Sequence, residues 1–235
     1  MDLSPQRVVE EALRTGCKSI AYTYTEPTVF FEYTYDTSKL AHKHGLKNVY
    51  VTNGYMSPEM IKVYNTLDAA NVDVKGNEEF YKKVCGARME GVLDSIKRLY
   101  RKGVHLELTN LIIPGYNDDE ESIRQIVGFI KGIDKEIPLH FSAFYPCYKL
   151  TDAPPTPRDT LVKARQIALD EGLSYVYCGN TFPGDPYENT YCPSCGELLI
   201  ERYGFSVTRI KLRNGRCPSC GQRIRVVLPD AKNRH

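Results

Sequence analysis

The stretch VHLELTNLIIPGYNDDEESIRQIVGFIKGI (104–133) contains one complete strand, loop and helix. Residues 104–113 are rich in Val, Ile and Leu, which favours a strand, and a Pro-Gly turn ends that run. Residues 119–133 then show the amphipathic pattern of a helix. A strand that leads directly into a helix is the repeating unit of parallel β/α folds, so this stretch predicts that fold class.

The same alternation recurs through the first 180 residues, with strand-to-strand steps of about thirty residues, the length of a βα unit. Six such units form either an open doubly wound sheet or a partial barrel. The first predicted strand is not followed by a G-x-G-x-x-G turn, which favours the partial parallel barrel. The predicted strands are 18–24, 48–52, 71–75, 104–113, 138–144 and 173–178, and the predicted helices are 5–15, 34–44, 57–66, 89–102, 119–133 and 159–171.

The end of the chain differs from its beginning in composition and pattern. Residues 201–235 carry nine Lys or Arg against two Asp or Glu, whereas the whole chain has a net charge of only +2. Three short alternating runs predict a small antiparallel sheet here. We therefore divide the chain into a β/α barrel at 1–180 and a linker with a C-terminal ribbon at 181–235. The three runs are ELLIERY (197–203), SVTRIKL (206–212) and QRIRVVL (222–228).

The ribbon carries a repeated cysteine motif, CPSCG, at 192–196 and 217–221. Each C-x-x-C places two thiolates on one tight turn, and two such turns supply four sulfurs to a tetrahedral ion. A closed four-thiolate site is typical of structural zinc, and rubredoxin-like iron uses the same ligands. We predict a structural zinc site with iron as the alternative; its ligands are Cys192, Cys195, Cys217 and Cys220.

The sequence has neither a signal-peptide pattern nor a membrane-spanning run, and this bears on the expected compartment and partners. The N-terminus has no apolar centre of a signal peptide, and no apolar run reaches the roughly 18 residues of a membrane span. A cytoplasmic protein without a membrane partner is therefore expected, and in that compartment thiols stay reduced and available for metal. The basic ribbon offers only Tyr203 and Phe205 for base stacking. We therefore predict that the ribbon stabilises the fold and does not bind nucleic acid.

Polar side chains gather at the carboxyl ends of the predicted strands, where parallel β/α folds carry their function. Alternation places Asp73 and Lys75 on one face of their strand, and an acid beside a base is costly to bury unless the two are paired or bind a ligand. Together the strand ends form a rim suited to a charged, zwitterionic small molecule. The rim residues are Thr25, Glu26, Thr52, Asn53, Asp73, Lys75, Pro114 and Gly115, with His140 near the start of the fifth strand.

Ordered segments along nearly the whole chain resemble the radical S-adenosylmethionine (SAM) enzymes. More narrowly, they resemble the pyruvate formate-lyase-activating-enzyme-like proteins of the AmmeMemoRadiSam system. The segments are AYTYTEPTVFFEY (21–33), VYVTNGYMSPE (49–59), VDVKG (72–76), LELTNLIIPGYNDDEE (106–121), HFSAFYPCYK (140–149), VYCGN (176–180) and ENTYCPSCG (188–196).

The resemblance implies a partial barrel whose upper rim binds SAM beside a [4Fe–4S] cluster. The cluster reduces the sulfonium and releases a 5′-deoxyadenosyl radical, which abstracts hydrogen from a protein or small substrate. By the family pattern, Thr25 and Glu26 match the segment at the methionyl amine, and Asp73 and Lys75 match the segment at the amino acid moiety. Thr52 and Asn53 lie beside the sulfonium and ribose. The remaining matches are Ile113, Pro114 and Gly115 near adenine, and His140 at the position of a strand histidine.

One departure from the family pattern concerns the cluster. Family members hold it with C-x-x-x-C-x-x-C after their first strand, and the 235 residues contain no such triplet. We therefore expect that the first strand and the cluster loop are missing, and that this chain alone does not cleave SAM. The family pattern also points to a protein substrate or to partners from the AmmeMemoRadiSam system.

Two other functions compete with the radical SAM interpretation. One is a non-catalytic module that binds SAM or a partner protein, with the zinc ribbon as its contact surface. The other is a lyase that forms a Schiff base on Lys75, with Asp73 as the proton carrier. The lyase ranks last because it explains neither the ribbon nor the other polar strand ends.

Overall fold

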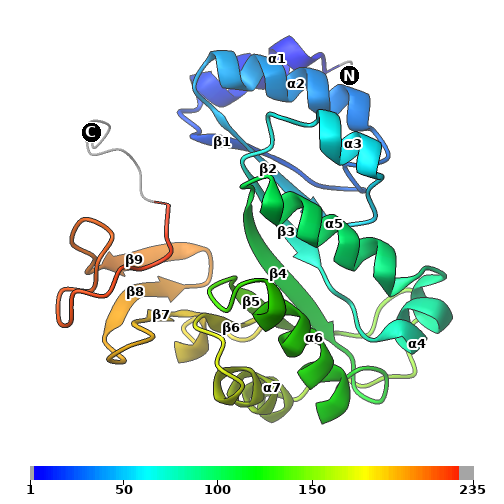
Figure 1. The fold of residues 1–235 in the computed structure, drawn as a ribbon, viewed down its shortest axis with the longest axis vertical. Helices are drawn as coiled ribbons and strands as arrows, with labels where there is room; N and C mark the ends of the chain where they lie inside the picture. The colour runs from blue at the N-terminus through cyan, green and yellow to red at the C-terminus, as the bar shows by residue number, and fades with distance from the viewer. Residues whose placement is uncertain (1–2, 228–235) are drawn as a thin grey trace.

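The computed structural model of the chain describes residues 3–227 and shows a curved parallel sheet with a small ribbon beside it (Figure 1). Six strands lie in the sheet in sequence order, and each neighbouring pair is parallel. The partial-barrel prediction is confirmed, and each of the six strands predicted for the barrel overlaps an observed one. The strands are β1 (Ser19–Tyr22), β2 (Lys47–Thr52), β3 (Ala69–Asp73), β4 (His105–Ile112), β5 (Leu139–Ala143) and β6 (Val176–Gly179).

Helices follow the outer side of the sheet from β1 to β6 (Figure 1). All six predicted helices are present, and three short elements were not foreseen. The predicted helices are α1 (Pro5–Arg14), α2 (Phe31–Lys43), α3 (Pro58–Val63), α5 (Met89–Arg101), α6 (Glu120–Ile133) and α7 (Arg158–Asp170). The short elements are α4 (Glu78–Phe80), the π-helix η1 (Tyr81–Cys85) and the 3₁₀ helix η2 (Pro186–Glu188).

The start of α6 shows why the helices begin where they do. The Asp119 carboxylate caps the helix by accepting the Ser122 N–H at 2.8 Å, which satisfies a donor that has no partner within the helix. Ser57 caps α3 in the same way, with Pro58 as the first helical residue. These local signals place each helix directly after a strand, so that it folds back over the sheet.

The two faces of the sheet have different chemistry. On the helix-covered face, Leu106, Leu108 and Ile112 of β4 are fully buried and belong to one hydrophobic core with side chains of α5 and α6. Burying each such side chain contributes about 1.5–3 kcal/mol. The alternate residues of the strands point to the opposite face, which we call the concave face; it carries polar groups such as Glu107 and Thr109.

The ribbon is a three-stranded antiparallel sheet, with strand order β7-β8-β9. Its strands are β7 (Thr190–Tyr191), β8 (Leu198–Tyr203) and β9 (Ser206–Ile210). The prediction of a strand at 222–228 was wrong for the described residues 222–227, and β7 takes the third place instead. The reason is a tertiary contact: the Arg225 N–H donates to the Tyr175 hydroxyl, and the Arg225 guanidinium pairs with Asp134.

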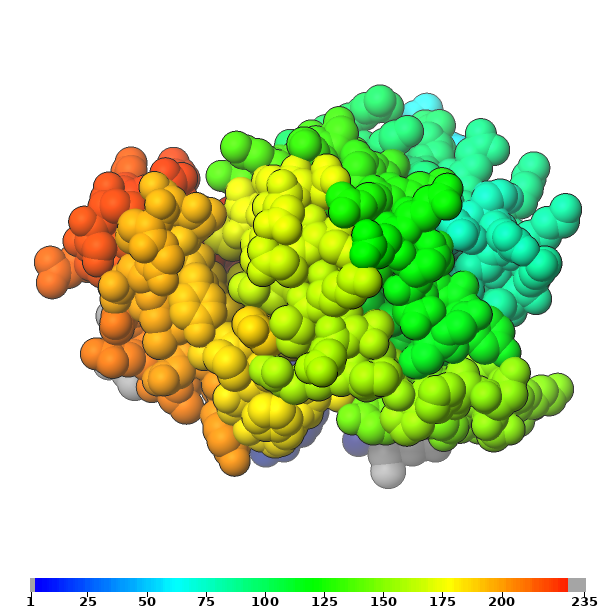
Figure 2. All heavy atoms as spheres, turned by 90° about the horizontal axis from the view of Figure 1, so that it is seen from below, coloured from blue at the N-terminus to red at the C-terminus, as the bar shows by residue number. Residues whose placement is uncertain are grey.

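The ribbon packs against the β6 side of the barrel, where Figure 2 shows it as a lobe beside the segment near residue 175. Its core includes Tyr175 together with Leu199 and Ile200 of β8. The predicted linker is also packed, because Asp185 is fully buried and accepts from Arg158 of α7 at 2.8 Å. No helix within residues 3–227 combines the length and the apolar character needed to cross a membrane.

A glycine at position 54, two residues after β2, is required by both the backbone conformation and the surrounding side chains. Its φ of +75° lies in the left-handed region that other residues adopt only at a cost. A Cβ atom there would lie 2.5 Å from Cγ1 of Val72 and 3.0 Å from Cγ1 of Val92. Both valines are buried in the main core, so neither has room to move aside.

Gly54→Ala is therefore predicted to destabilise the fold more than Gly16→Ala. Gly16 has a similar φ of +72°, but a Cβ atom at that residue would meet nothing within 4 Å. In the control variant Gly16→Ala, the free energy of unfolding should fall by about 1–2 kcal/mol, because alanine is strained in the left-handed backbone conformation. In Gly54→Ala, the free energy of unfolding should fall by about 1–3 kcal/mol more than in the control, because the added methyl group overpacks the core. Urea denaturation measures both, and equal losses would contradict the close packing at Gly54.

Candidate functional site

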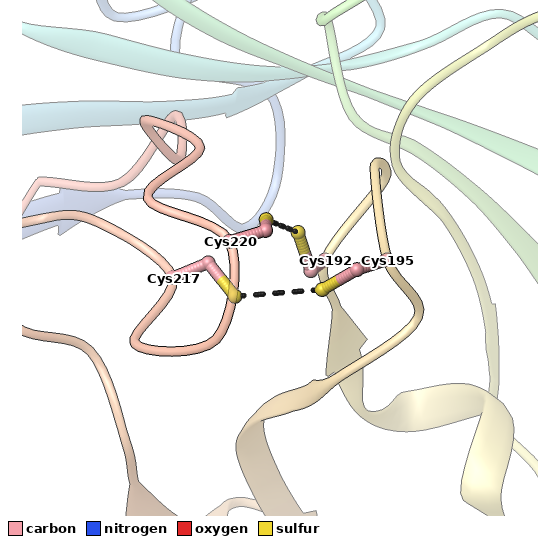
Figure 3. Close-up of side chains that lie close together, drawn as sticks. All are labelled: Cys192, Cys195, Cys217 and Cys220. Carbon is pink, nitrogen blue, oxygen red and sulfur yellow. Dashed lines mark hydrogen bonds between the residues drawn. The ribbon is translucent and has the colours of Figure 1, made fainter.

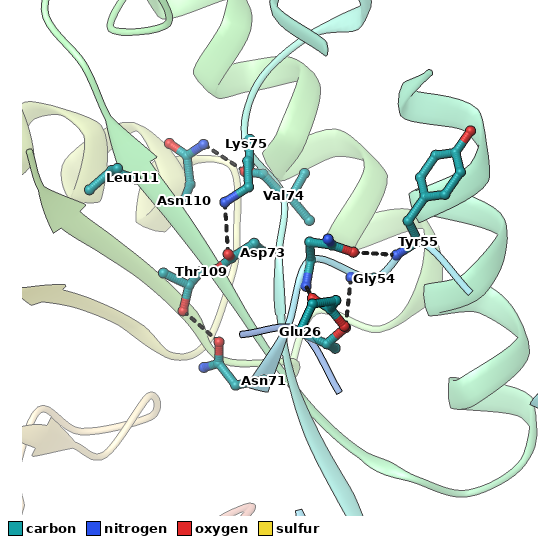
Figure 4. Close-up of polar contacts among 12 residues, drawn as sticks. Glu26, Gly54, Tyr55, Asn71, Asp73, Val74, Lys75, Thr109, Asn110 and Leu111 are labelled. Carbon is teal, nitrogen blue, oxygen red and sulfur yellow. Dashed lines mark hydrogen bonds and ion pairs between the residues drawn. The ribbon is translucent and has the colours of Figure 1, made fainter. Parts of the chain in front are cut away.

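Glu26 ties the carboxyl ends of β1 and β2 together (Figure 4). One carboxylate oxygen accepts the Thr52 hydroxyl at 2.6 Å and the Thr28 N–H at 3.2 Å, and the other accepts the Asn53 N–H at 2.8 Å. A carboxylate has about four acceptor positions, so one is left for a ligand. Thr25 is exposed beside this cluster.

Asn53 and Thr52 shape the turn that follows β2. The Thr52 hydroxyl accepts the Gly54 N–H at 3.0 Å, and the Asn53 side-chain oxygen accepts the Tyr55 N–H at 2.9 Å. These bonds hold the half-buried Asn53 at the rim. Its side-chain NH₂ makes no hydrogen bond to another of residues 3–227, so its donors stay available to a ligand.

Asp73 and Lys75 form an ion pair at the end of β3, with 2.8 Å between the ammonium and a carboxylate oxygen (Figure 4). Both side chains are 35% exposed, whereas Val72 and Val74 on the other face are fully buried. The prediction that the acid and the base share a face is confirmed. A pair this exposed contributes about 0–1 kcal/mol to folding, so stability alone does not explain it.

The loop after β4 is held by Asn117, a polar residue after the fourth predicted strand that was not among the predicted ligand-binding residues. The buried Asn117 accepts the Ile113 N–H at 2.6 Å and donates to the carbonyls of Lys75, at 2.6 Å, and Leu111, at 2.9 Å. It therefore fixes the ends of β3 and β4 against each other. Ile113 itself is buried, which leaves Pro114 and the exposed Gly115 as the accessible part of the loop.

Two further side chains support the end of β3. Asn110 of β4 donates to the Val74 carbonyl at 2.7 Å, at the point where β3 leaves the sheet (Figure 4). Tyr81, on the π-helix η1, accepts the Lys75 N–H at 3.1 Å and donates to the Asp73 carbonyl at 3.4 Å. Burial raises the pKa of Tyr81 to about 12, so its hydroxyl stays protonated as a donor.

His140 lies in the same row of the concave face as Asp73. The strand register pairs Asp73 with Thr109, Thr109 with His140, and His140 with Tyr177. The sheet is staggered, so the end of β3 lies level with the start of β5. This register brings His140 to the level of the rim even though it stands near the beginning of its strand.

The partner of His140 is Glu107, a second residue that sequence reasoning missed. Nε2 of His140 lies 2.8 Å from one Glu107 oxygen, and Nε2 of His105 lies 3.8 Å from the other. Burial alone would raise the pKa of Glu107, but its contacts with His105 and His140 outweigh burial and hold the pKa well below the usual range. The alternation in HLELT (105–109), which puts Glu107 on the polar face, is the signal that could have identified it.

The row continues from the barrel into the ribbon. The His140 and Tyr177 rings stack with 5.0 Å between centroids, and the Tyr177 hydroxyl lies 3.1 Å from the Thr190 hydroxyl of β7. The Arg202 guanidinium of β8 lies 5.7 Å from the centre of the same Tyr177 ring. The ribbon therefore contacts the side chains that line the concave face.

The predicted metal ligands meet in the ribbon, where the turns at 192–196 and 217–221 face each other (Figure 3). The sulfur atoms of Cys192, Cys195, Cys217 and Cys220 all lie within 4.8 Å of one another. The pairs Cys192–Cys220 and Cys195–Cys217 are separated by 3.6 Å and 3.7 Å, too far for a disulfide. Sulfurs placed tetrahedrally at about 2.3 Å from one ion lie about 3.8 Å apart, so this geometry fits zinc or iron.

A [4Fe–4S] cluster does not fit the thiols of residues 3–227. The ribbon holds the one group of three or more metal-ligand side chains found in that part of the chain, and its four sulfurs converge on a single point. Cys17 lies before β1, at the opposite end of the strand from the rim, and Cys178 faces α7, with its sulfur 3.6 Å from the Leu161 carbonyl. The half-exposed, oppositely charged groups of the rim do fit a zwitterion such as SAM.

Comparison with known proteins identifies the family of this chain. The model of the Radical SAM superfamily matches residues 1–127. The uncharacterised protein MJ0808 of Methanocaldococcus jannaschii is 50% identical over 230 residues, which are 97% of this chain and 68% of that protein. The pyruvate formate-lyase 1-activating enzyme of Escherichia coli is 22% identical over 161 residues, or 62% of this chain and 65% of the enzyme.

Among solved structures, a domain of the pyruvate-formate lyase-activating enzyme from Bacteroides vulgatus has a similar fold. The TM-score is 0.61 at 18% identity, over 69% of this chain and 99% of that domain. The chain spans about two thirds of the length of the two curated relatives named above. The family match covers more than half of the 235 residues, and the chain belongs to the radical SAM superfamily.

Proposed function

We propose that the rim at the carboxyl ends of β1 to β4 binds SAM, and that the chain is the SAM-binding part of an enzyme resembling glycyl-radical activases. The Asp73–Lys75 pair carries this proposal, because it presents both charges to solvent at a point where Glu26, Asn110 and Asn117 hold the strand ends in place. A binding site positioned by buried hydrogen bonds orients its ligand at little further entropic cost.

We assign each rim residue to a part of SAM by the charge, hydrogen-bond donor or acceptor that the residue has available for a ligand. Lys75 and Asp73 face the carboxylate and the ammonium of the methionyl group, and the remaining acceptor position of Glu26 supports the ammonium. The side-chain NH₂ of Asn53 donates to ribose oxygens. The smaller contributions are those of Thr25 beside the methionyl amine and Thr52 beside the sulfonium. Ile113, Pro114 and Gly115 lie beside adenine, and His140 completes the proposed set of SAM-binding residues.

The chemistry requires a source of electrons that the described residues do not hold. In this superfamily, bound SAM supplies hydrogen abstraction once a cluster has reduced it. We propose that the three cluster thiolates come from outside these 235 residues, since the residues contain no C-x-x-x-C-x-x-C triplet. What this chain contributes is SAM binding, orientation and shielding from water.

The activating enzymes among the relatives also indicate the kind of partner. Similarity to a pyruvate formate-lyase 1-activating enzyme supports a protein substrate, and we propose one here, from the AmmeMemoRadiSam system or outside it. Membership of an enzyme superfamily does not favour the non-catalytic alternative. In the ribbon we propose a structural zinc ion, because a closed set of four thiolates leaves no open position for chemistry.

Asp73→Asn is predicted to weaken SAM binding by at least about tenfold, because a charged hydrogen bond contributes about 1.5–3 kcal/mol. Isothermal titration calorimetry measures the dissociation constant. Asp36→Asn is the matched control, since Asp36 pairs with Lys39 on the outer helix α2 at the same 2.8 Å. The control should bind SAM as the unaltered chain does. Equal affinity for both variants would remove Asp73 from the site.

Anaerobic reconstitution of the 235-residue chain with iron and sulfide should yield zinc or iron in the ribbon but no [4Fe–4S] cluster that supports SAM cleavage. Electron paramagnetic resonance detects the reduced cluster, and chromatography detects cleaved SAM. A version extended upstream in the genomic reading frame, if that frame encodes the triplet, should gain both signals. Cleavage by the 235-residue chain would show that it holds the cluster itself.

Cys220→Ser is predicted to abolish stoichiometric metal binding and to expose the ribbon core. Elemental analysis should find one zinc per unaltered chain and markedly less in the variant. Cys17→Ser is the control, because Cys17 is exposed and distant from the ribbon in the sequence. Limited proteolysis should cut the variant within 190–227 first. A ribbon that stays protected without metal would contradict the proposed role of zinc.

A further inference from the structure

The outermost strand of the ribbon, β9, has a free edge that the fold does not use. In the strand order β7-β8-β9 it pairs with β8, and no further strand of residues 3–227 lies along its other side (Figure 1). All of its residues, Ser206–Ile210, are exposed. The main-chain N–H and C=O groups on the outer side of such a strand are able to pair with another extended segment.

Apolar side chains on the β8–β9 hairpin face solvent. Phe205, in the turn between the two strands, is fully exposed, and Val207 and Ile210 of β9 are more than half exposed. By contrast, Leu199 and Ile200 of β8 are buried in the ribbon core. The three exposed side chains therefore add little to folding, and apolar groups exposed beside a free strand edge are typical of a surface that contacts another protein.

The strand register shows which face of the ribbon carries the apolar side chains of β9. Val207 stands opposite Arg202, and Ile210 stands opposite Ile200. Residues that are directly opposite in antiparallel strands lie on the same face of the sheet. The Arg202 guanidinium lies 5.7 Å from the centre of the Tyr177 ring, on the concave face of the barrel. Val207 and Ile210 are therefore on the side of the ribbon that borders the concave face.

The charge around β9 indicates the kind of partner. Residues 201–227 contain seven Lys or Arg and one Glu. Lys211 pairs with Glu197 at 2.7 Å, but the exposed Arg209 and Arg213 form no ion pair with any acid in the described part of the chain. An acidic segment would neutralise these two guanidiniums, whereas a second copy of β9 would add like charges to the same edge. Charge complementarity therefore favours an acidic partner over a second copy.

A nucleic acid is also negatively charged, but the shape of the surface favours a polypeptide. Single-stranded nucleic acids are held by stacking of their bases on aromatic rings. The exposed apolar side chains within β9, Val207 and Ile210, are aliphatic. A free strand edge instead offers donors and acceptors at the spacing of another peptide backbone.

We propose that β9 and the turn at Phe205 form a docking site for an extended, acidic segment of a partner protein, which adds to the ribbon as a fourth strand. Phe205 and Val207 make the apolar contacts, and Arg209 and Arg213 face the acidic side chains. The inference rests on the proposed function only in taking the partner to be a protein. A binding assay without SAM tests it separately from the SAM site.

Fluorescence anisotropy of the zinc-loaded full chain with a labelled decapeptide of alternating Glu and Val tests the proposal. The peptide should bind, and a decapeptide of alternating Lys and Val should bind at least about tenfold more weakly, because its charges repel the arginines. Phe205→Ser should weaken binding of the acidic peptide by about tenfold or more, since aromatic anchors dominate such contacts. Tyr148→Ser, at another highly exposed aromatic residue, is the control and should bind normally.

Amide hydrogen exchange supplies a readout that charge attraction alone would not change. The acidic peptide should slow exchange in β9, because strand addition pairs main-chain N–H groups, and should leave the other free sheet edge, β1, unchanged. Arg209→Glu should weaken binding by about fivefold or more at low salt. Arg101→Glu, the same change of charge on the outer helix α5, should have a smaller effect.

Equal affinity for the two peptides, or unchanged exchange in β9, would overturn the proposal. So would a single-stranded RNA decamer that binds more tightly than the acidic peptide and loses affinity in Phe205→Ser, or dimerisation through β9 without peptide binding. Phe205 lies outside the ribbon core, so its variant should keep the zinc content and the unfolding midpoint of the unaltered chain. Those two measurements separate lost binding from lost folding.

Discussion

The site depends on side chains that replace backbone hydrogen bonds where the parallel strands separate. Beyond Val74, β3 leaves the sheet, and its carbonyls would be left buried without donors. Asn110 and Asn117 supply those donors, and Asn117 also fixes the loop after β4. An unsatisfied buried polar group costs about 1–3 kcal/mol, so these amides make the separated strand ends stable. That separation is what allows Asp73 and Lys75 to reach solvent.

Side-chain contacts also link the barrel to the ribbon. A parallel sheet is normally covered on both faces, but here helices cover one face and the other stays polar. The ribbon borders this concave face beyond β6, where Arg202 and Thr190 contact Tyr177. The four thiols of this small sheet converge on one point, and the metal that we propose there would add a cross-link that its few apolar residues do not supply. The proposed metal would thereby stabilise the ribbon side chains that contact Tyr177 on the concave face.

Periodic patterns in the sequence were sufficient to predict the alternating strands and helices of the barrel. Strand and helix runs alternate clearly, and the repeated CPSCG places its own ligands, so both features follow from local spacing. The contacts that position the site are not local. Asn117 reaches Lys75 across 42 residues, and His140 reaches Glu107 across 33. The run at 222–228 alternates like a strand, yet docking on Tyr175 and Asp134 decides the conformation of its described residues. The domain boundary at 180 and the roles of the rim residues toward SAM stay predictions.

In the structure proposed here for the bound state, SAM occupies the rim between Glu26 and the loop after β4. The most direct test is a crystal structure of the zinc-loaded chain with S-adenosylhomocysteine, which has the same amino acid, ribose and adenine groups but no reactive sulfonium. We expect the amino acid group to lie against Asp73 and Lys75, and adenine to lie beside Pro114 and Gly115. Electron density for the ligand at the ribbon, or on the outer face among the helices, would contradict it.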